Sequence, residues 1–263
     1  AGGARAEGNG YSGTGLMNLD TRAFDPGLRR LFGLEAAAEA LPPLCGSLEI
    51  AGRVTAGAAA ACGLREGTPV IGGMFDIDAC ALAVNVTREG PVCMIAGTWS
   101  INEYIRREPV TDGRVLMNSL FCLPGYYLIE ESSPTSAGNN EWFVRQLLPE
   151  IAERARAEGR SVYSVVDAWA SEFAPGDFVP VFLPFLTGSN VDPRARGAFI
   201  GLNASHTRKH MLRAVFEGVA FSHRYHLERL LATRTDAPDC IRLAGGASRS
   251  AVWTRLFADV MQR

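Results

Sequence analysis

Three apolar runs of this sequence end in glycine: "TPVIGG" at 68–73, "VCMIAGT" at 92–98 and "CIRLAGG" at 240–246. Each run has the length and residue types of a buried strand. A turn between a strand and a helix aims several backbone N–H groups at one point, and glycine lets an anion approach them closely. The sequence therefore predicts a layered α/β protein with three turns that could each hold an anion.

The segments between these turns predict the remaining elements. Strands are expected at 47–54, 101–107, 114–123, 125–133 and 178–186. Helices are expected at 25–34, 55–63, 76–86, 137–159, 163–174, 206–233 and after the last glycine turn. Asp25 and Thr55 stand at expected helix N-caps, and Gly63 stands where a helix should end. Strands grouped before helices, with a final strand–glycine–helix unit, are typical of a layered α/β architecture.

Composition excludes several classes of function. The net charge of -2 gives no electrostatic reason to expect nucleic acid or an anionic membrane as a partner. No apolar run approaches the roughly 18–20 residues that cross a bilayer, and the first residues lack the apolar core of a secretory signal. A cytoplasmic protein is therefore expected. The single lysine, Lys209, stands in no G-K-[ST] tripeptide, so a Walker-type phosphate loop is excluded.

Metal chemistry has little support in the sequence. The six cysteines form no C-x-x-C pair and none has zinc-ligand spacing with a histidine, which predicts buried, reduced thiols and no metal site. His206 and His210 are four residues apart on a predicted helix, but no third ligand accompanies them. We expect these two histidines to serve helix packing and capping.

Two carboxylates, Asp76 and Asp78, open the predicted helix at 76–86. They could include the base of a kinase, which accepts the proton of an attacking hydroxyl. They could also be the nucleophile and acid of a haloacid dehalogenase-type phosphatase, although that chemistry needs a later lysine and a later acidic pair on Mg²⁺. The two acids lie about 200° apart around a helix, so both cannot face one atom equally, and we expect Asp78 to stabilise the helix end.

Several segments resemble those of the FGGY carbohydrate kinases. In chain order they are "SGTGLMNL", "EIAGRVT", "GGMFDIDACALAVNV", "GPVCMIAGTWS", "SPTSAGNNEWF", "GAFIGLNASHTRKHMLRAVFEG" and "AGGASRSAVWTRLFADV". Within that family, "GTWSINEY" and "PGYYLIEESSPTSAGNNEWF" are most similar to L-xylulose and 3-keto-L-gulonate kinases. The family's opening strand and D-x-G-T turn have no counterpart here, so we expect an internal piece of a kinase that would be inactive alone.

The resemblance implies an actin-like (ribonuclease H-like) two-domain sugar kinase fold of the α/β class, with an incomplete N-terminal domain. Residues 1–87 would form the end of the sugar-binding domain, and residues 88–263 would form the nucleotide-binding domain. The implied activity is transfer of the γ-phosphoryl group of ATP to a hydroxyl of a ketose such as L-xylulose. A non-catalytic sugar-binding regulator built on the same fold is a further alternative. Mg²⁺ would arrive with ATP and not in a protein cage. A homodimer is one expected assembly.

The resemblance also implies roles for individual residues. Asp76, by its offset from the glycine pair before it, would be the catalytic base. The phosphate loop would be formed by Gly97 and Thr98. The nucleotide turn, with a serine near adenine, would consist of Gly245, Gly246, Ala247 and Ser250.

Overall fold

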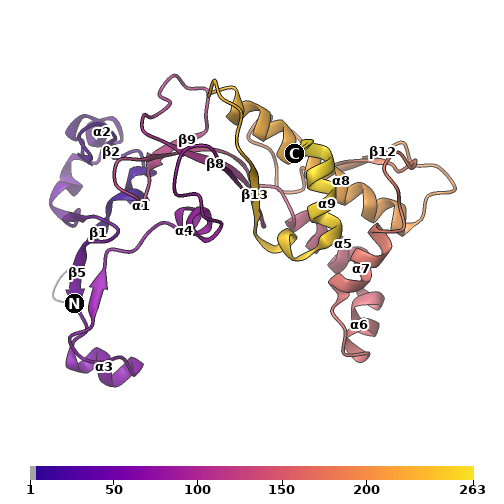
Figure 1. The fold of residues 1–263 in the computed structure, drawn as a ribbon, viewed down its shortest axis with the longest axis horizontal. Helices are drawn as coiled ribbons and strands as arrows, with labels where there is room; N and C mark the ends of the chain where they lie inside the picture. Colours follow the sequence, from indigo (N-terminus) through magenta and orange to yellow (C-terminus); the bar gives the residue numbers. More distant parts are fainter. Residues whose placement is uncertain (1–3) are drawn as a thin grey trace. The chain divides into compact units, whose positions relative to one another are not determined.

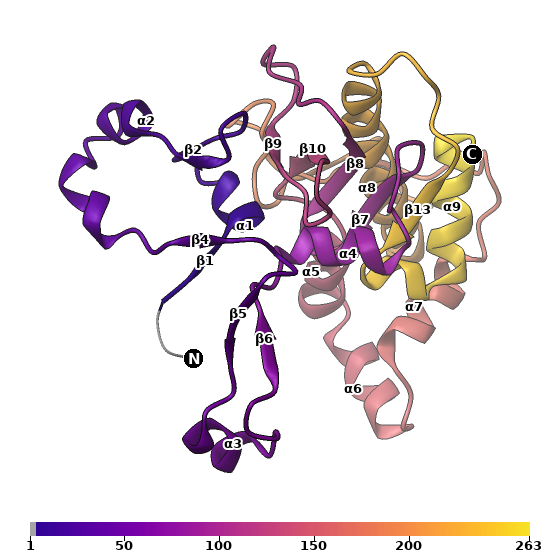
Figure 2. The ribbon, with the colours of Figure 1, turned by 60° about the vertical axis from the view of Figure 1, so that its left-hand side comes forward.

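The computed structural model describes residues 4–263 and divides them into two compact units. The first unit takes residues up to Glu89 together with Tyr104–Ile129, and the second takes Gly90–Glu103 together with Glu130–Arg263. Figures 1 and 2 show the elements of each unit, and the strands β8 and β10 continue from one unit into the other.

The first unit is built from short strands and short helices. Its elements are β1 Ala6–Glu7, α1 Gly8–Ser12, β2 Met17–Asn18, β3 Ala23–Phe24, α2 Pro26–Leu31, the 3₁₀ helix η1 Glu35–Ala40, β4 Leu44–Cys45, β5 Ile50–Arg53, α3 Ala56–Cys62, β6 Pro69–Ile71, α4 Asp76–Ala83 and β9 Met117–Leu120. The strands β1 and β4 pair in parallel, whereas β2–β3 and β5–β6 are antiparallel pairs.

Local sequence signals set the helix ends in this unit. The Asp25 side chain accepts hydrogen bonds from two N–H groups at the start of α2, with Pro26 in the first helical position. Thr55 caps α3 by accepting from the Ala58 N–H, and Gly63 ends α3 in the left-handed region at φ 75°. These predicted caps are confirmed because each depends only on residues within a few positions of the helix end.

One prediction in this unit is wrong. The run at 68–73 was expected to be a buried strand, but β6 is exposed along its length. Its single hydrogen-bonded neighbour is β5, and a two-stranded ladder has too little surface to bury its own faces. The apolar side chains of Val70 and Ile71 are therefore 40% and 46% exposed.

The second unit carries the larger core. Its elements are β7 Val92–Ala96, the first part of β8 Ser100–Arg106, the last part of β10 Tyr127–Ser133, α5 Gly138–Leu147, α6 Pro149–Ala157, α7 Val162–Ala170, β11 Val181–Leu183, β12 Ala198–Ile200, α8 Arg208–Leu231, β13 Ile241–Ala244, the 3₁₀ helix η2 Gly246–Arg249 and α9 Ala251–Met261. The strands β13, β7, β8 and β10 are neighbours in this order within one sheet.

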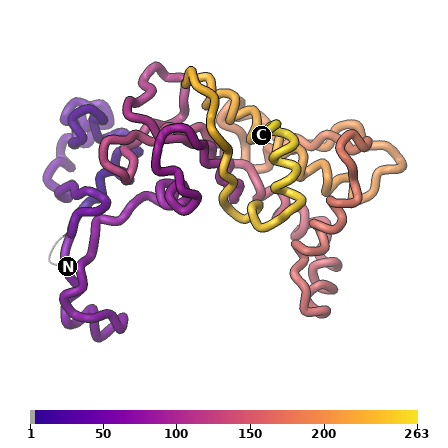
Figure 3. Tube along the Cα trace, in the orientation of Figure 1, coloured from indigo at the N-terminus to yellow at the C-terminus, as the bar shows by residue number. Residues whose placement is uncertain are grey.

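The strand β7 is an interior strand of this sheet and lies between β13 and β8. All five of its residues are buried, as expected for a strand with a neighbour on each edge. It pairs in parallel with β13 and antiparallel with β8. The chain trace in Figure 3 turns sharply between β13 and α9, which forms the predicted strand–glycine–helix unit.

Helices cover this sheet and complete the core. The ring of Phe216 on α8 lies 4.3 Å from that of Trp253 on α9, and both side chains are buried. The helix expected over 137–159 is two helices, α5 and α6, which meet at Leu148 and Pro149. A proline lacks the N–H that would continue α5, but it suits the first position of a new helix.

Candidate phosphate and nucleotide site

The predicted phosphate loop is a tight connection between two strands. Gly97, Thr98 and Trp99 join β7 to β8, and the paired residues Ala96 and Ser100 close the connection. The Gly97 N–H donates to the carbonyl oxygen of Trp99 at 3.2 Å. The strand expected over 101–107 is confirmed as β8, so the general expectation that each glycine turn joins a strand to a helix is wrong for this turn. The helix end that faces this turn comes from elsewhere in the chain.

That helix end belongs to α5. A Cβ atom on Gly138, the first residue of α5, would lie 3.5 Å from both Cγ2 and the carbonyl oxygen of Thr98. The N-terminus of α5 therefore packs on the exposed Thr98, where the helix adds partial positive charge. Sequence reasoning missed this contact, although the segment "SPTSAG" before α5 carries the small and polar residues of a helix start.

The last glycine turn lies directly against the predicted phosphate loop. A Cβ atom on Gly245 would stand 2.7 Å from the carbonyl oxygen of Ala96 and 3.1 Å from the Gly97 nitrogen. Gly245 has φ 83° and ψ -173°, a backbone conformation that is essentially restricted to glycine. The structure thus brings together two turns that are far apart in sequence, and glycine is what allows their backbones to touch.

The residues after Gly245 have different environments. Gly246 is exposed, and a Cβ atom added there would meet nothing within 4 Å, whereas Ala247 is buried. The Ser250 hydroxyl caps α9 by accepting the Trp253 N–H at 3.1 Å. Open space therefore surrounds Gly246, while the side chain of Ser250 already has a partner within the fold.

Asp76 lies in the first unit, at the N-terminus of α4. It follows Gly73, which has φ 86°, and its side chain is exposed. The carboxylate oxygen Oδ1 accepts the N–H of Ile77 at 2.9 Å. The N-cap residue Phe75 makes no side-chain cap hydrogen bond, and the exposed carboxylate of Asp76 remains accessible to a ligand.

Asp78 differs sharply from its neighbour. Its side chain is 1% exposed and accepts a hydrogen bond from the Asn9 amide on α1. Burial raises the pKa of Asp78 to about 8, and the nearby Glu7 charge adds to the shift. The sequence predicted that Asp78 stabilises the helix end. Asp78 does lie in the first turn of α4, but the buried carboxyl with a raised pKa is mostly protonated near neutral pH, so it lacks the charge that would stabilise the helix N-terminus. The side chain points into the interior of the unit and not along the exposed first turn.

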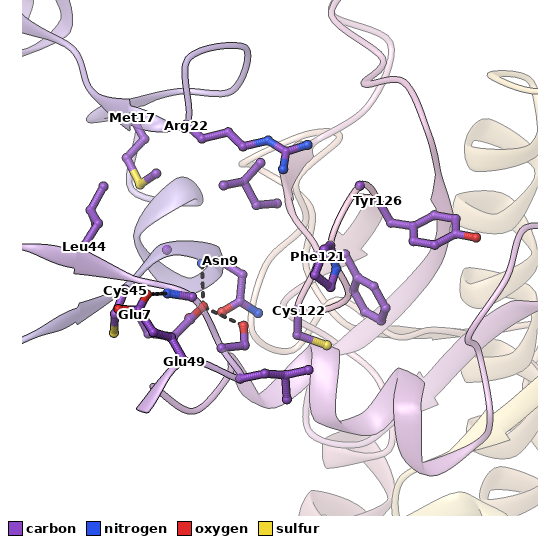
Figure 4. Close-up of a pocket in the computed structure, with 17 residues that line it drawn as sticks. Glu7, Asn9, Met17, Arg22, Leu44, Cys45, Glu49, Phe121, Cys122 and Tyr126 are labelled. Carbon is purple, nitrogen blue, oxygen red and sulfur yellow. Dashed lines mark hydrogen bonds between the residues drawn. The ribbon is translucent and has the colours of Figure 1, made fainter. Parts of the chain in front are cut away.

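The group around Asp78 also borders a pocket of the first unit, shown in Figure 4. This pocket has a volume of about 380 Å³, and its lining includes Glu7, Asn9, Arg22, Cys45 and Cys122. The pKa of the Cys122 thiol is raised to about 12, first by burial and then by the Asp78 charge. The thiol therefore stays protonated, which excludes it as a nucleophile near neutral pH.

The remaining titratable candidates have structural partners. His210 caps α8 through Thr207, and its ring lies 5.3 Å from that of His206, so the predicted packing and capping roles are confirmed. Lys209 pairs with Glu172 at 2.5 Å on the surface. Within residues 4–263, no three His, Cys, Asp or Glu side chains are grouped so that they could hold a metal ion.

The second unit thus combines the parallel strand pair β13–β7, two glycine turns in contact and a helix N-terminus beside one of them. This is an arrangement by which α/β proteins hold phosphate groups through backbone amides. The chain belongs to the FGGY family of carbohydrate kinases, as the resemblance predicted. The model of the family's N-terminal domain matches residues 6–83, and that of its C-terminal domain matches residues 92–263.

Individual relatives agree with this assignment. The L-xylulose/3-keto-L-gulonate kinase of Escherichia coli strain K12 is 36% identical over 258 residues, covering 97% of this chain and 49% of that protein. A probable L-xylulose kinase of Pasteurella multocida is 34% identical over 250 residues, covering 94% of this chain and 49% of that protein. The chain spans about half the length of the curated relatives that it matches.

A solved structure shows the same fold. The xylulose kinase of Rhodospirillum rubrum superposes with a TM-score of 0.77 at 33% identity, covering 94% of this chain and 48% of that one. The α/β, actin-like fold of the sugar kinases that the sequence predicted is thereby confirmed. In residues 4–263, no helix has both the length and the apolar character needed to cross a membrane.

Proposed function

We propose that this chain is the part of an ATP-dependent sugar kinase that carries the catalytic base and the nucleotide turns. The reaction would transfer the γ-phosphoryl group of ATP to a hydroxyl of a ketose such as L-xylulose. The observation that carries the proposal is the contact between Gly245 and the backbone of Ala96 and Gly97. This contact brings two glycine turns together in a member of a carbohydrate kinase family, which supports their proposed roles as nucleotide turn and phosphate turn.

The proposed roles follow from exposure and charge. Asp76 is an exposed carboxylate that can accept the proton of the sugar hydroxyl during attack on phosphorus. The backbone N–H groups near Gly97, the Thr98 hydroxyl and the N-terminus of α5 would hold the phosphates. Gly246 offers open space for the nucleotide, and Ala247 fixes the start of η2. Ser250 would act through its cap on α9 and not through direct contact with adenine.

Mg²⁺ belongs to this proposal as the companion of ATP. Without a cluster of three suitable ligands in the described residues, the ion would be held by phosphate oxygens and water, which suits its coordination chemistry. Its contribution would be to neutralise phosphate charge.

We also propose the division into a sugar-binding part, 1–87, and a nucleotide-binding part, 88–263. The interval between the two family matches supports this division.

The test is an assay of the intact natural protein with ATP, Mg²⁺ and a panel of pentuloses and hexulosonates, read as ADP release. Asp76→Asn keeps the shape of the side chain but removes the base, so it should abolish most turnover. Asp20→Asn, an exposed acid of the same unit, is the matched control and should leave turnover unchanged. Equal activity of Asp76→Asn and the unaltered protein would refute the assignment of the base. The predicted homodimer is checked on the same sample by light scattering.

A further inference from the structure

A buried histidine, His223, links the strand β8, which follows the phosphate loop, to the segment that precedes α5. His223 lies on α8 and is 0% exposed. Its Nδ1 atom lies 3.1 Å from the Ser100 hydroxyl and 3.3 Å from the Asn102 amide oxygen, both on β8. Its Nε2 atom lies 2.8 Å from the Ser136 hydroxyl, before α5. A single imidazole ring therefore bridges three structural elements of the second unit.

The direction of these hydrogen bonds can be worked out. The Asn102 amide nitrogen donates to the Glu131 carbonyl oxygen at 3.4 Å, so its amide oxygen faces the ring of His223. An amide oxygen can only accept, and Nδ1 must therefore carry the proton. Nε2 is then an acceptor, and the Ser136 hydroxyl donates to it. His223 acts as a neutral group with one donor and one acceptor, aimed in opposite directions.

The imidazole stays neutral under ordinary conditions. Complete burial lowers the pKa of His223 to about 3, and the neighbouring His226 contributes to the shift. The groups that face the ring from β8 and from the segment before α5 are the uncharged side chains of Ser100, Asn102 and Ser136. From α9, the edge of the Phe257 ring packs against it at 5.2 Å. The hydrogen bonds of His223 therefore do not require protonation of its imidazole to the charged form.

Both ends of this bridge lead to Thr98. Ser100 closes the connection that contains Gly97 and Thr98, because it pairs with Ala96 across β7 and β8. Ser136 lies two residues before Gly138, the residue of α5 that packs against Thr98. The ring of His223 thus fixes the distance between the loop and the helix N-terminus that packs on it.

We infer that His223 is a positioning residue for the phosphate loop, holding the loop and the start of α5 in the geometry that receives the phosphates of ATP. This inference deepens the proposed function and rests on it. His223 does not touch the reacting atoms. It acts through Ser100 and Ser136, and these two hydroxyls would lose a buried partner if the ring were replaced by an apolar one.

The test uses His223→Phe in the intact natural protein, because phenylalanine keeps a ring of similar size and removes the hydrogen bonds to Ser100, Asn102 and Ser136. His226→Phe is the matched control. His226 is on the same helix and 2% exposed, but it bonds to Glu131 and not to the loop segments. Hydrogen exchange of a peptide covering residues 97–100 should become faster in His223→Phe and stay near the unaltered rate in His226→Phe. Equal protection in both variants would overturn the inference.

Nucleotide binding provides the second readout. The dissociation constant for ADP, measured by calorimetry, should rise about tenfold in His223→Phe, the scale of one broken buried hydrogen bond, and should change little in His226→Phe. Ser136→Ala should reproduce part of this loss, and the effects of the two changes should not add, since they interrupt the same bridge. Unchanged ADP affinity in His223→Phe would overturn the inference.

Two further results separate this inference from the proposed function. Long-range proton–nitrogen spectra should show His223 as the Nδ1-protonated tautomer near neutral pH, and the opposite tautomer would overturn the bridge as described. Failure of the unaltered protein to bind ADP would instead overturn the proposed function. The hydrogen-exchange and tautomer measurements would then still decide whether His223 holds the loop in position.

Discussion

The contact between the two glycine turns makes a sharp prediction about Gly245 and Gly246. A methyl group at Gly245 would stand 2.7 Å from the Ala96 carbonyl oxygen and 2.9 Å from its carbon. Both atoms belong to the buried strand β7, so they cannot move without disturbing its ladders with β13 and β8. At Gly246 a methyl group would meet nothing within 4 Å. Neighbouring glycines should therefore respond very differently to the same substitution.

The magnitude follows from the two penalties at Gly245. A residue with a side chain held at its φ and ψ costs about 1–3 kcal/mol, and inserting a methyl into a packed region costs about 1–3 kcal/mol more. Gly245→Ala should therefore lower the free energy of unfolding by about 2–6 kcal/mol. Gly246→Ala should change it by less than about 1 kcal/mol in either direction, because its methyl is accommodated without a clash.

The assay is urea unfolding of the unaltered protein and both variants, with the slope m compared to verify that the unfolding transition is the same. Gly246→Val then tests the site itself. It should weaken ATP binding in calorimetry while the free energy of unfolding stays close to that of the unaltered protein. Full stability of Gly245→Ala would refute the contact between the turns. Full ATP affinity of Gly246→Val would remove Gly246 from the nucleotide site.

Three further substitutions test other parts of the argument. Asp76→Asn should reduce turnover by about 10²–10⁴ with little change in the dissociation constant for ATP, and Asp20→Asn serves as the control in steady-state kinetics. Thr98→Val should weaken ATP binding but leave urea unfolding nearly unchanged, because Thr98 is exposed; normal ATP affinity would exclude its hydroxyl from the site. Gly218→Ala should destabilise the fold by about 1–3 kcal/mol, although alanine normally favours a helix, since its Cβ would stand 2.4 Å from the Phe182 carbonyl oxygen. Thermal unfolding measures this, and a stabilised variant would contradict the close packing of α8.

Local signals in the sequence were sufficient for much of the fold. The caps of α2 and α3 are set by Asp25, Thr55 and Gly63, and each acts on N–H or C=O groups within a few residues. The strand β7 was predictable because a wholly apolar run of its length suits a central strand. The glycine turns were found for a related reason: glycine after such a run indicates a backbone conformation that other residues avoid.

Contacts between distant segments could not be predicted in the same way. Nothing in the residues near Gly97 indicates that Gly245 will touch them, or that the helix N-terminus at Thr98 will be that of α5. His223 and His226 lie three residues apart on one helix, and both are buried. Only the fold determines that the first bonds to the loop segments and the second to Glu131.

Asp78 was misinterpreted for the same reason. An acid in the first turn of a helix usually faces water, and no local feature of "FDIDAC" indicates that α1 will cover it. The structure buries Asp78 beside Asn9 and Glu7, which come from a distant part of the sequence. The distinction between an exposed Asp76 and a buried Asp78 also disfavours a two-acid phosphatase, because the two carboxylates lie in different environments.

The raised pKa of Asp78 predicts a stability that falls as the pH rises. The pKa is about 8 in the folded protein against an ordinary value of 3.8, so between these values the folded protein holds a proton that the unfolded chain has released. The unfolded state then binds fewer protons, and the free energy of unfolding decreases with pH through this window. The stabilising contribution is complete below about pH 4 and is lost as the pH approaches 8.

Asp78→Asn removes this titration, and near pH 7 it should stabilise the fold by an amount on the order of 2–4 kcal/mol. Urea unfolding from pH 5 to pH 8 measures the effect, with Asp20→Asn as the control that keeps the slope. Glu7→Gln should lower the upper limit of this pH window, since it removes a charge that raises the pKa of Asp78 in the folded protein. The same pH slope in Asp78→Asn as in the unaltered protein would show that Asp78 is not the group responsible.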